Sequence, residues 1–258
     1  MVTADDFGLS EAVNEAVERG HRDGILSAAS LMVAEPAAAD AVARARRLPS
    51  LRVGLHVVAV DGAPLLPPEQ VPALVGTDGR FPTNLAGAGV RIFFDPAARR
   101  QLKAEVRAQF EAFAATGLPL DHVNAHHHYH LHPTLLATIL EVGRSFGMKA
   151  LRLPAEPSGP VFLRPWIALM RRRLRRAGLA HNDWLLGLSA TGRMTEATTL
   201  ELIGRVPRQG VSELYFHPVA ERPGSAGELE LRALTAPAVA AALARAGLQP
   251  AGFAELAG

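Results

Sequence analysis

The chain contains no cysteine, and this absence limits the chemistry that it can carry out. Disulfide bonds, thiolate metal ligands and a cysteine nucleophile are all excluded, so any metal ion must be held by His, Asp or Glu. Lysine is almost absent too, since Lys103 and Lys149 are the only two, and arginine supplies nearly all the positive charge. The net charge is nevertheless only +2 at pH 7, which gives little support to nucleic-acid binding.

Long apolar runs and several enzyme motifs are also missing. No stretch reaches the ~18 consecutive apolar residues of a membrane-spanning helix, and no charged region followed by an apolar run indicates a signal peptide. We therefore expect a cytoplasmic protein, and the sequence leaves open its oligomeric state and whether the natural chain starts upstream of Met1. Serine hydrolase, nucleotide-driven and dinucleotide-dependent functions lose support, because the sequence has no Gly-Xaa-Ser-Xaa-Gly, Gly-Lys-Ser/Thr or Gly-Xaa-Gly-Xaa-Xaa-Gly motif.

The pattern of apolar residues predicts an α/β fold. With 258 residues, 48% of them hydrophobic, the chain can form one large domain or two small ones. Apolar runs predict strands at residues 2–4, 27–33, 51–57, 121–125, 149–153, 212–216 and 248–253. Periodic stretches predict helices at residues 10–22, 37–47, 96–116, 133–146, 195–206 and 237–246. Strands separated by helices imply parallel βα units, so about seven strands would form either a doubly wound sheet or a barrel.

Two stretches depart from this alternation. Residues 61–95 hold several Pro and Gly without a clear period, which predicts a long loop. Residues 155–194 also break the rhythm, and we expect a lid-like helical insertion over residues 155–190. We expect residues 1–258 to form a single domain that contains this insertion.

Ionisable side chains follow five of the predicted strands, and this placement favours the barrel. They are Asp5 and Asp6, His56, the histidine cluster at 126–132, Arg152 and His217. The carboxyl ends of the strands in a parallel barrel converge on one face, where active sites lie. Taken alone, the aspartates could form a helix-capping turn, His56 could be a core histidine and His217 a turn residue. The cluster could bind metal adventitiously at the surface, but it holds five of the ten histidines, and the joint arrangement favours a site.

The residue types in these positions suit metal-assisted hydrolysis. Two histidines and one carboxylate can hold a metal ion while leaving positions open for water and substrate. Such a metal polarises a carbonyl group and acidifies water. A second carboxylate can accept a proton, and a histidine opposite can protonate a departing amine. Asp5 and Asp6 can divide the two carboxylate roles, because neighbouring side chains on an extended segment point in different directions.

Four motifs in this order resemble the YdjC-like (ChbG-type) carbohydrate deacetylase family. They are Thr-Ala-Asp-Asp-Phe-Gly at 3–8, Gly-Leu-His at 54–56, Asp-His-Val-Asn-Ala-His-His-His-Tyr-His at 121–130 and Phe-His-Pro at 216–218. Within the family, residues 31–33, 118–126 and 151–154 are most similar to the hopanoid-biosynthesis-associated branch, HpnK. The resemblance implies a (β/α) barrel-like fold and a metal-dependent hydrolase that removes the acetyl group from an N-acetylglucosamine unit.

The resemblance also implies a role for each candidate site residue. The ligands of one divalent metal ion would be Asp6, His56 and His126. Asp5 would be the base, His217 the acid and Arg152 the residue that orients the base. Zn²⁺ is favoured by the ligand chemistry, whereas Mg²⁺ is often associated with the family.

The hopanoid branch implies a particular substrate, an N-acetylglucosaminyl hopanoid, which is a sugar on a membrane triterpenoid. The insertion suits it, because residues 161–179 combine apolar side chains with arginines, as expected for peripheral contact with an anionic inner membrane surface. An ordinary helix with a solvated arginine face would show the same pattern. Other functions stay open: deacetylation of soluble chitooligosaccharides, hydrolysis of another amide or a phosphoester, or carbohydrate or lipid binding without catalysis.

Overall fold

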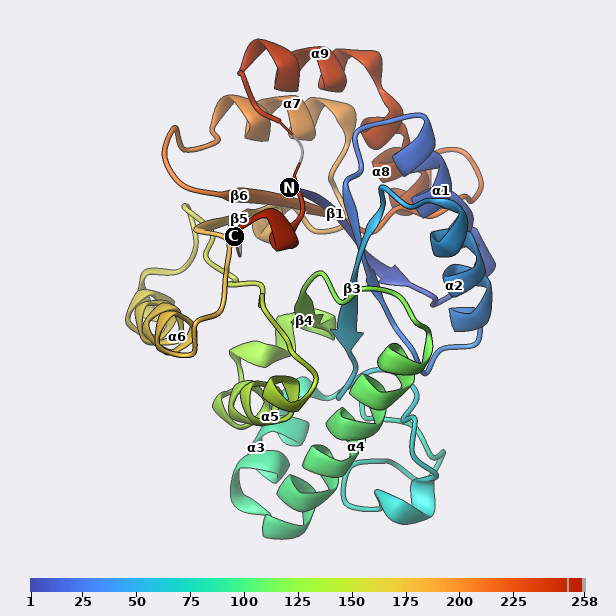
Figure 1. Ribbon diagram of the computed structural model, residues 1–258, viewed down its shortest axis with the longest axis vertical. Helices are drawn as coiled ribbons and strands as arrows, with labels where there is room; N and C mark the ends of the chain where they lie inside the picture. The colour runs from blue at the N-terminus through green and yellow to red at the C-terminus, as the bar shows by residue number, and fades with distance from the viewer. Residues whose placement is uncertain (250, 257–258) are drawn as a thin grey trace.

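The computed structural model describes residues 1–249 and 251–256 and contains a six-stranded sheet with the strand order β4-β3-β2-β1-β6-β5 (Figure 1). The strands are β1 (Val2–Phe7), β2 (Ala28–Leu31), β3 (Arg52–Val57), β4 (Val123–Ala125), β5 (Trp184–Leu186) and β6 (Ser212–Phe216). All neighbouring strands are parallel, and helices connect them around the sheet. The α/β prediction is therefore confirmed.

The sheet curls into a partial barrel, and two isolated parallel bridges span the opening between its edge strands. They join Val123 of β4 to Leu151, and Ala150 to Ala180, which lies shortly before β5. The strand predicted at 149–153 is limited to these bridges, because the Asn182 side chain takes the next backbone partners: it accepts from the Leu153 N–H (2.7 Å) and donates to the Leu153 carbonyl (2.8 Å). The fold is thus the expected barrel-like single domain, with six strands instead of about seven.

Nine α-helices lie outside the sheet in the described part of the chain. They are α1 (Glu11–Arg22), α2 (Ala38–Arg47), α3 (Leu85–Phe94), α4 (Pro96–Ala115), α5 (Pro133–Ser145), α6 (Arg164–Arg176), α7 (Glu196–Gly204), α8 (Ala226–Thr235) and α9 (Pro237–Arg245). Short 3-10 helices are η1 (Pro68–Gln70), η2 (His126–Leu131), η3 (Val161–Leu163), η4 (Leu188–Ala190) and η5 (Phe253–Leu256). None of these helices combines the length and apolarity that a membrane crossing requires.

The predicted helices form largely where the sequence places them, and their apolar stripes cover the sheet. Ser10 caps α1 by accepting the Val13 N–H on its Oγ (3.2 Å). The apolar stripe of α4 is buried along its whole length: Leu102, Val106, Phe110 and Phe113. This burial holds the carboxyl ends of the strands in a fixed arrangement, which a catalytic site requires.

The prediction of a loop throughout residues 61–95 is wrong, because α3 occupies the last part of this segment. Asn84 begins α3 by accepting the Gly87 N–H on its Oδ1 (3.0 Å). The helix keeps the apolar side chains of Val90 and Phe94 exposed to solvent, so its apolar residues are not confined to the buried face.

The final predicted strand, residues 248–253, is also wrong for the described residues, with Pro250 lying outside them. The backbone N–H groups of Phe253 and Ala254 donate to the Asp121 carboxylate (3.2 and 2.9 Å), which holds the segment as the 3-10 helix η5. The apolar pattern of the sequence predicts neither β5 nor α8; β5 is only three residues long and lies inside the segment 155–190, for which that pattern predicts an insertion.

Candidate metal and catalytic site

A β-bulge in β1 brings the two adjacent aspartates to the same pocket. The register with β2 shifts between Ala4 and Phe7, so that β1 holds an extra residue there. Asp6 adopts a left-handed backbone conformation (φ 64°), which Asp tolerates better than most residues. In a regular strand the two side chains would lie on opposite faces. Because of the bulge, Asp5 and Asp6 both line one pocket while facing different partners.

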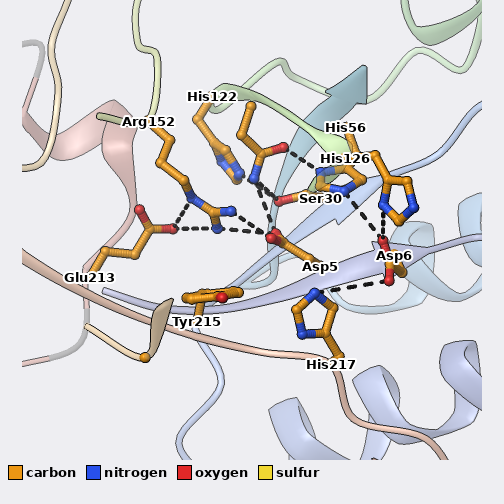
Figure 2. A network of polar contacts seen from close by, with 12 residues as sticks. Asp5, Asp6, Ser30, His56, His122, His126, Arg152, Glu213, Tyr215 and His217 are labelled. Atoms are coloured by element: carbon orange, nitrogen blue, oxygen red, sulfur yellow. Dashed lines mark hydrogen bonds and ion pairs between the residues drawn. The ribbon is translucent and has the colours of Figure 1, made fainter. Parts of the chain in front are cut away.

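Asp6 lies between two histidines in an arrangement that fits a metal site (Figure 2). Its Oδ1 is 3.2 Å from Nε2 of His56 and 3.0 Å from Nδ1 of His126, and the three ligand atoms lie within 4.8 Å of one another. Among the described residues, His56 Nε2 is buried and makes no hydrogen bond, as expected of a nitrogen reserved for a metal ion. Burial raises the pKa of Asp6, but the two histidines hold it well below its usual range. These residues therefore fit a divalent cation.

Asn124 fixes the orientation of His56 and connects it to Asp5. The register between β3 and β4 places His56 beside Asn124, and His56 Nδ1 lies 2.6 Å from the Asn124 Oδ1. Because Oδ1 can only accept, His56 carries its proton on Nδ1, which leaves the lone pair on Nε2. The Asn124 amide in turn donates to Asp5 Oδ1 (3.1 Å) and to Ser30 Oγ (2.9 Å).

Asp5 belongs to a buried charge triad with Arg152 and Glu213 (Figure 2). Arg152 contacts both oxygens of Asp5, Nη1 to Oδ2 at 2.5 Å and Nη2 to Oδ1 at 3.0 Å, and its Nη2 also donates to Glu213 Oε1 (2.7 Å). All three side chains are almost completely buried. Burial raises the pKa of Asp5, but the Arg152 charge and its hydrogen bonds outweigh this and hold the pKa far below its usual range. Asp5 is therefore ionised and immobilised.

His217 directly follows β6 and faces Asp6 from the other side of the pocket, with Nε2 4.0 Å from Asp6 Oδ2 (Figure 2). Its side chain is 31% exposed, in contrast to the buried Asp5. The His217 backbone N–H donates to Oε2 of Glu230 (2.5 Å), a buried residue of α8, where burial raises the pKa of the carboxyl group. The pocket holds about 500 Å³, enough for a sugar ring.

The histidine cluster at 126–132 divides into side chains with different environments. His127 turns outward and lies 2.8 Å from Oδ2 of Asp61, whereas His128 turns inward and its ring packs perpendicular to Tyr215. His127 and His128 both have left-handed backbone conformations (φ 53° and 51°), which produce this reversal. His130 is buried, and its Nε2 lies 3.1 Å from the Arg152 carbonyl; burial lowers its pKa to about 3. Within the cluster, His130 thus belongs to the buried core, whereas His126, His127 and His128 line the pocket.

The structure brings together all six sequence-predicted site residues and adds four that the sequence analysis missed: Ser30, Asn124, Glu213 and Glu230. Glu213 could have been recognised from the sequence, because a charged residue inside an apolar strand needs a buried partner of opposite charge. Glu230 carries no such signal within an ordinary helix.

Gly54 gives a physical reason for the Gly-Leu-His motif. Ser30 on β2 pairs with Gly54 on β3, and its Oγ reaches across β3 to Nε2 of His122 (3.0 Å), which directly precedes β4. A Cβ at Gly54 would lie 2.5 Å from the His122 ring, so any other residue would displace this contact.

Comparison with known proteins gives consistent matches along the chain. A family described as "YdjC-like protein" matches residues 1–245. A carbohydrate deacetylase of Vibrio vulnificus (strain CMCP6) is 41% identical over 146 residues, which are 57% of this chain and 55% of the relative. A carbohydrate deacetylase of Brevibacillus brevis is 36% identical over 146 residues, 57% of this chain and 56% of that one. These matches span about half the length of the relatives. A carbohydrate deacetylase of Geobacillus stearothermophilus is 30% identical over 96% of this chain and 94% of its own.

Two solved structures share the fold. A putative cellobiose-phosphate cleavage protein from Enterococcus faecalis V583 superposes with a TM-score of 0.82 at 24% identity, covering 99% of this chain and 97% of that one. The lactam utilization protein of Thermus thermophilus gives a TM-score of 0.56 at 17% identity, covering 98% of both chains. At these identities the likeness supports the barrel-like fold alone.

Proposed function

Because the chain belongs to the YdjC-like protein family, we propose that it is a metal-dependent hydrolase that removes the acetyl group from an N-acetylated amino sugar. The observation that carries this proposal is the bulge in β1, which sets Asp6 against two histidines and Asp5 against Arg152 in one pocket. The names of the relatives support the same reaction class, including the Geobacillus protein that aligns over 94% of its length. Binding without catalysis would not require a ligand carboxylate and a second, immobilised carboxylate side by side.

We assign the reaction to residues on two sides of the pocket. A divalent cation held by Asp6, His56 and His126 would supply Lewis acidity, polarising the acetyl carbonyl and acidifying the attacking water. Two imidazoles and one carboxylate favour Zn²⁺ over Mg²⁺ as that cation. Asp5 accepts the proton of the water as its oxygen attacks the acetyl carbon, and Arg152 holds the carboxylate in position.

His217 completes the reaction on the opposite side. The C–N bond breaks as His217 donates a proton to the sugar nitrogen, so that the products are acetate and a free amine. Histidine suits this role because its protonation changes near neutral pH, and His217 is the more exposed of the two proton-transfer groups. Glu230 holds its backbone N–H, which fixes the position from which the ring reaches the pocket.

We propose that the sugar belongs to a glycolipid, in keeping with the hopanoid-type motifs, and that residues 155–190 contribute a lid for its lipid part. Phe162 and Val161 are 80% and 68% exposed at the start of this segment. A mainly apolar groove of about 700 Å³ lies between α6 and residues 154–160. Trp166 Nε1 donates to the Leu131 carbonyl (2.8 Å), which connects the insertion to the end of the helix that begins with His126.

The charge of α6 supports contact with a membrane surface. Met170 and Leu174 are buried toward the barrel, while the arginines at 172, 173, 175 and 176 are exposed. An apolar head followed by an exposed basic face is suited to the anionic inner leaflet of a membrane, approached from the cytoplasm.

The test is acetate release from N-acetylglucosaminyl hopanoid and from N,N′-diacetylchitobiose by metal-reconstituted protein. The proposal expects release from both, with a higher kcat/KM on the glycolipid. Preference for the soluble disaccharide would replace the glycolipid with a chitooligosaccharide as substrate. Release from neither would leave a non-catalytic carbohydrate-binding barrel or a hydrolase of another bond.

A further inference from the structure

A second group of metal-ligating side chains lies next to the first and shares one residue with it. Asp61, His126 and His127 offer ligand atoms within 4.8 Å of one another. His127 Nε2 is 2.8 Å from Asp61 Oδ2, and the rings of His126 and His127 have centroids 4.1 Å apart. The donor set, two imidazoles and one carboxylate, equals that of the first group.

The backbone delivers these side chains from the ends of neighbouring strands. Asp61 follows β3 and His127 follows β4, and both residues have left-handed conformations (φ 49° and 53°). The Asp61 N–H donates to the Pro82 carbonyl (3.2 Å), which holds the loop in place. The side chains of His127 and Asp61 are 39% and 44% exposed, so a cation there would keep water among its ligands.

We propose that Asp61 and His127 form a second, weaker cation site that competes with the first for His126. A neutral imidazole has a single nitrogen lone pair, so His126 can serve only one of two cations at a time. Its Nδ1 already faces Asp6 in the buried group, which gives the first site the stronger claim. A cation on the second group is therefore held mainly by two residues and is bound less tightly.

The position of this second site makes it inhibitory. His127 lines the same pocket as Asp5 and His217, so a cation on it would reduce the space that this pocket leaves for the substrate. Recruitment of His126 would also weaken the first site. Excess zinc should consequently reduce an activity that a first equivalent of zinc supports, and this last step rests on the function proposed above.

The test is equilibrium binding of Zn²⁺, and of Co²⁺ followed by its visible absorption, to the metal-depleted protein. The unaltered chain should bind in a tight and a weak class, and Asp61→Asn and His127→Asn should each weaken only the weak class, by on the order of 10–100-fold or more. Asparagine is chosen because it tolerates the left-handed backbone at both positions. Asp78→Asn, which removes an exposed carboxylate elsewhere in the 61–95 segment, is the matched control and should leave both classes unchanged.

A single class of sites in the unaltered chain, or a weak class that survives both substitutions, would overturn the proposal. Near-ultraviolet circular dichroism of each variant separates loss of a ligand from loss of the fold. The binding measurement does not depend on the reaction. Two classes of metal site in a protein that releases no acetate would support the second site and contradict the proposed deacetylase function. Deacetylation that excess zinc does not inhibit would support the deacetylase function and contradict the inhibitory role of the second site.

Discussion

Arg152 donates hydrogen bonds to both carboxylate oxygens of Asp5, with Nη1 2.5 Å from Oδ2 and Nη2 3.0 Å from Oδ1. Both side chains are almost completely buried, and the Arg152 guanidinium also donates to Glu213 Oε1. Removing one member of such a pair leaves a buried charge without compensation, which costs several kcal/mol in typical proteins, about 3–5. The base proposed for the reaction is thus also a structural element, and any substitution there needs a stability measurement beside the rate.

Asp5→Asn should lower kcat by about 10²–10⁴-fold while metal binding is retained. The amide keeps the shape of the carboxylate and its one oxygen can still accept from Arg152, but its NH₂ group faces the other guanidinium donor, and the side chain cannot take the proton of the attacking water. Turnover, bound metal and melting temperature should be measured on the same preparation. Near-normal turnover with metal bound would transfer the role of base to another residue, with His128 and His130 as the next candidates.

His56→Ala and His126→Ala should each abolish tight metal binding and leave the fold largely intact. Each substitution removes one of three ligands, and a three-ligand site loses most of its affinity without any one of them. Metal content after dialysis is the measurement. His181→Ala is the matched control, since His181 lies outside the pocket and its Nδ1 hydrogen-bonds to the carbonyl group of the neighbouring Asn182. A metal found only among His128, His130 and His132 would contradict the assignment.

His217→Ala should reduce kcat by about 10²–10⁴-fold, again with metal bound. A general acid must be protonated to act, so the unaltered enzyme loses activity toward high pH, and the variant should lack this alkaline limb. The pH profile of kcat/KM is the deciding measurement. A variant that kept the alkaline limb would show that a different group protonates the sugar nitrogen.

The sequence predicted the site better than the details of the sheet, for a physical reason. Strand ends converge in a parallel barrel whatever the exact length of each strand, so His56, His126 and His217 meet even though β5 was missed. The role of Asp6 depends on a bulge, and no local pattern of apolar residues encodes the extra residue in β1. Asn124 lies 119 residues from its partner Asp5, and Glu213 lies 61 residues from its partner Arg152. The periodicity of the sequence cannot detect contacts between residues so far apart in the chain.

The errors in the predicted secondary structure have the same cause, since a local sequence pattern does not show which distant residues will contact a segment. The segment 248–253 is apolar enough for a strand, but a buried carboxylate 132 residues away, Asp121, takes its backbone donors. In α3 the apolar residues face solvent as well as the core, and the Gly and Pro residues around it favour a loop.

Asp121→Asn should destabilise the protein near neutral pH by about 1–3 kcal/mol, because charge-assisted hydrogen bonds from His122 and from two backbone N–H groups are weakened. Burial raises the pKa of Asp121, but His122 and these backbone donors outweigh it and lower the pKa. A carboxyl group whose pKa is lowered by folding stabilises the fold at pH values above its pKa in the unfolded chain, about 3.9. This stabilisation is lost as the pH falls through the pKa of the group in the folded state.

The difference in unfolding free energy between Asp121→Asn and the unaltered chain should therefore be constant from about pH 5 to 8 and shrink below about pH 4. Urea unfolding at several pH values measures it. A difference that grew on acidification would show that the carboxylate is not stabilised in its charged form. Asp78→Asn, at an exposed position, serves as the control and should show no such pH dependence.

The proposed lid cannot be tested by deleting residues 155–190, because this segment contains a strand of the sheet. The range 155–190 includes β5, whose residues Leu185 and Leu186 are buried beside β6, so deleting the whole range would unfold the sheet. The double substitution Val161→Ser, Phe162→Ser alters only the exposed head of the segment. Contact of these two side chains with lipid should be worth a few kcal/mol, at roughly 1.5–3 kcal/mol for each fully buried side chain.

We therefore expect kcat/KM on the glycolipid to fall about 100-fold or more, and kcat/KM on diacetylchitobiose to change by less than about twofold. Phe94→Ser is the matched control, because Phe94 is 71% exposed but lies on α3, outside the insertion. Vesicle co-sedimentation of the same variants, with and without anionic lipid, separates membrane binding from contact with the substrate itself. Equal losses on both substrates, or an equal loss in the Phe94 variant, would mean that the insertion has no specific role toward the lipid.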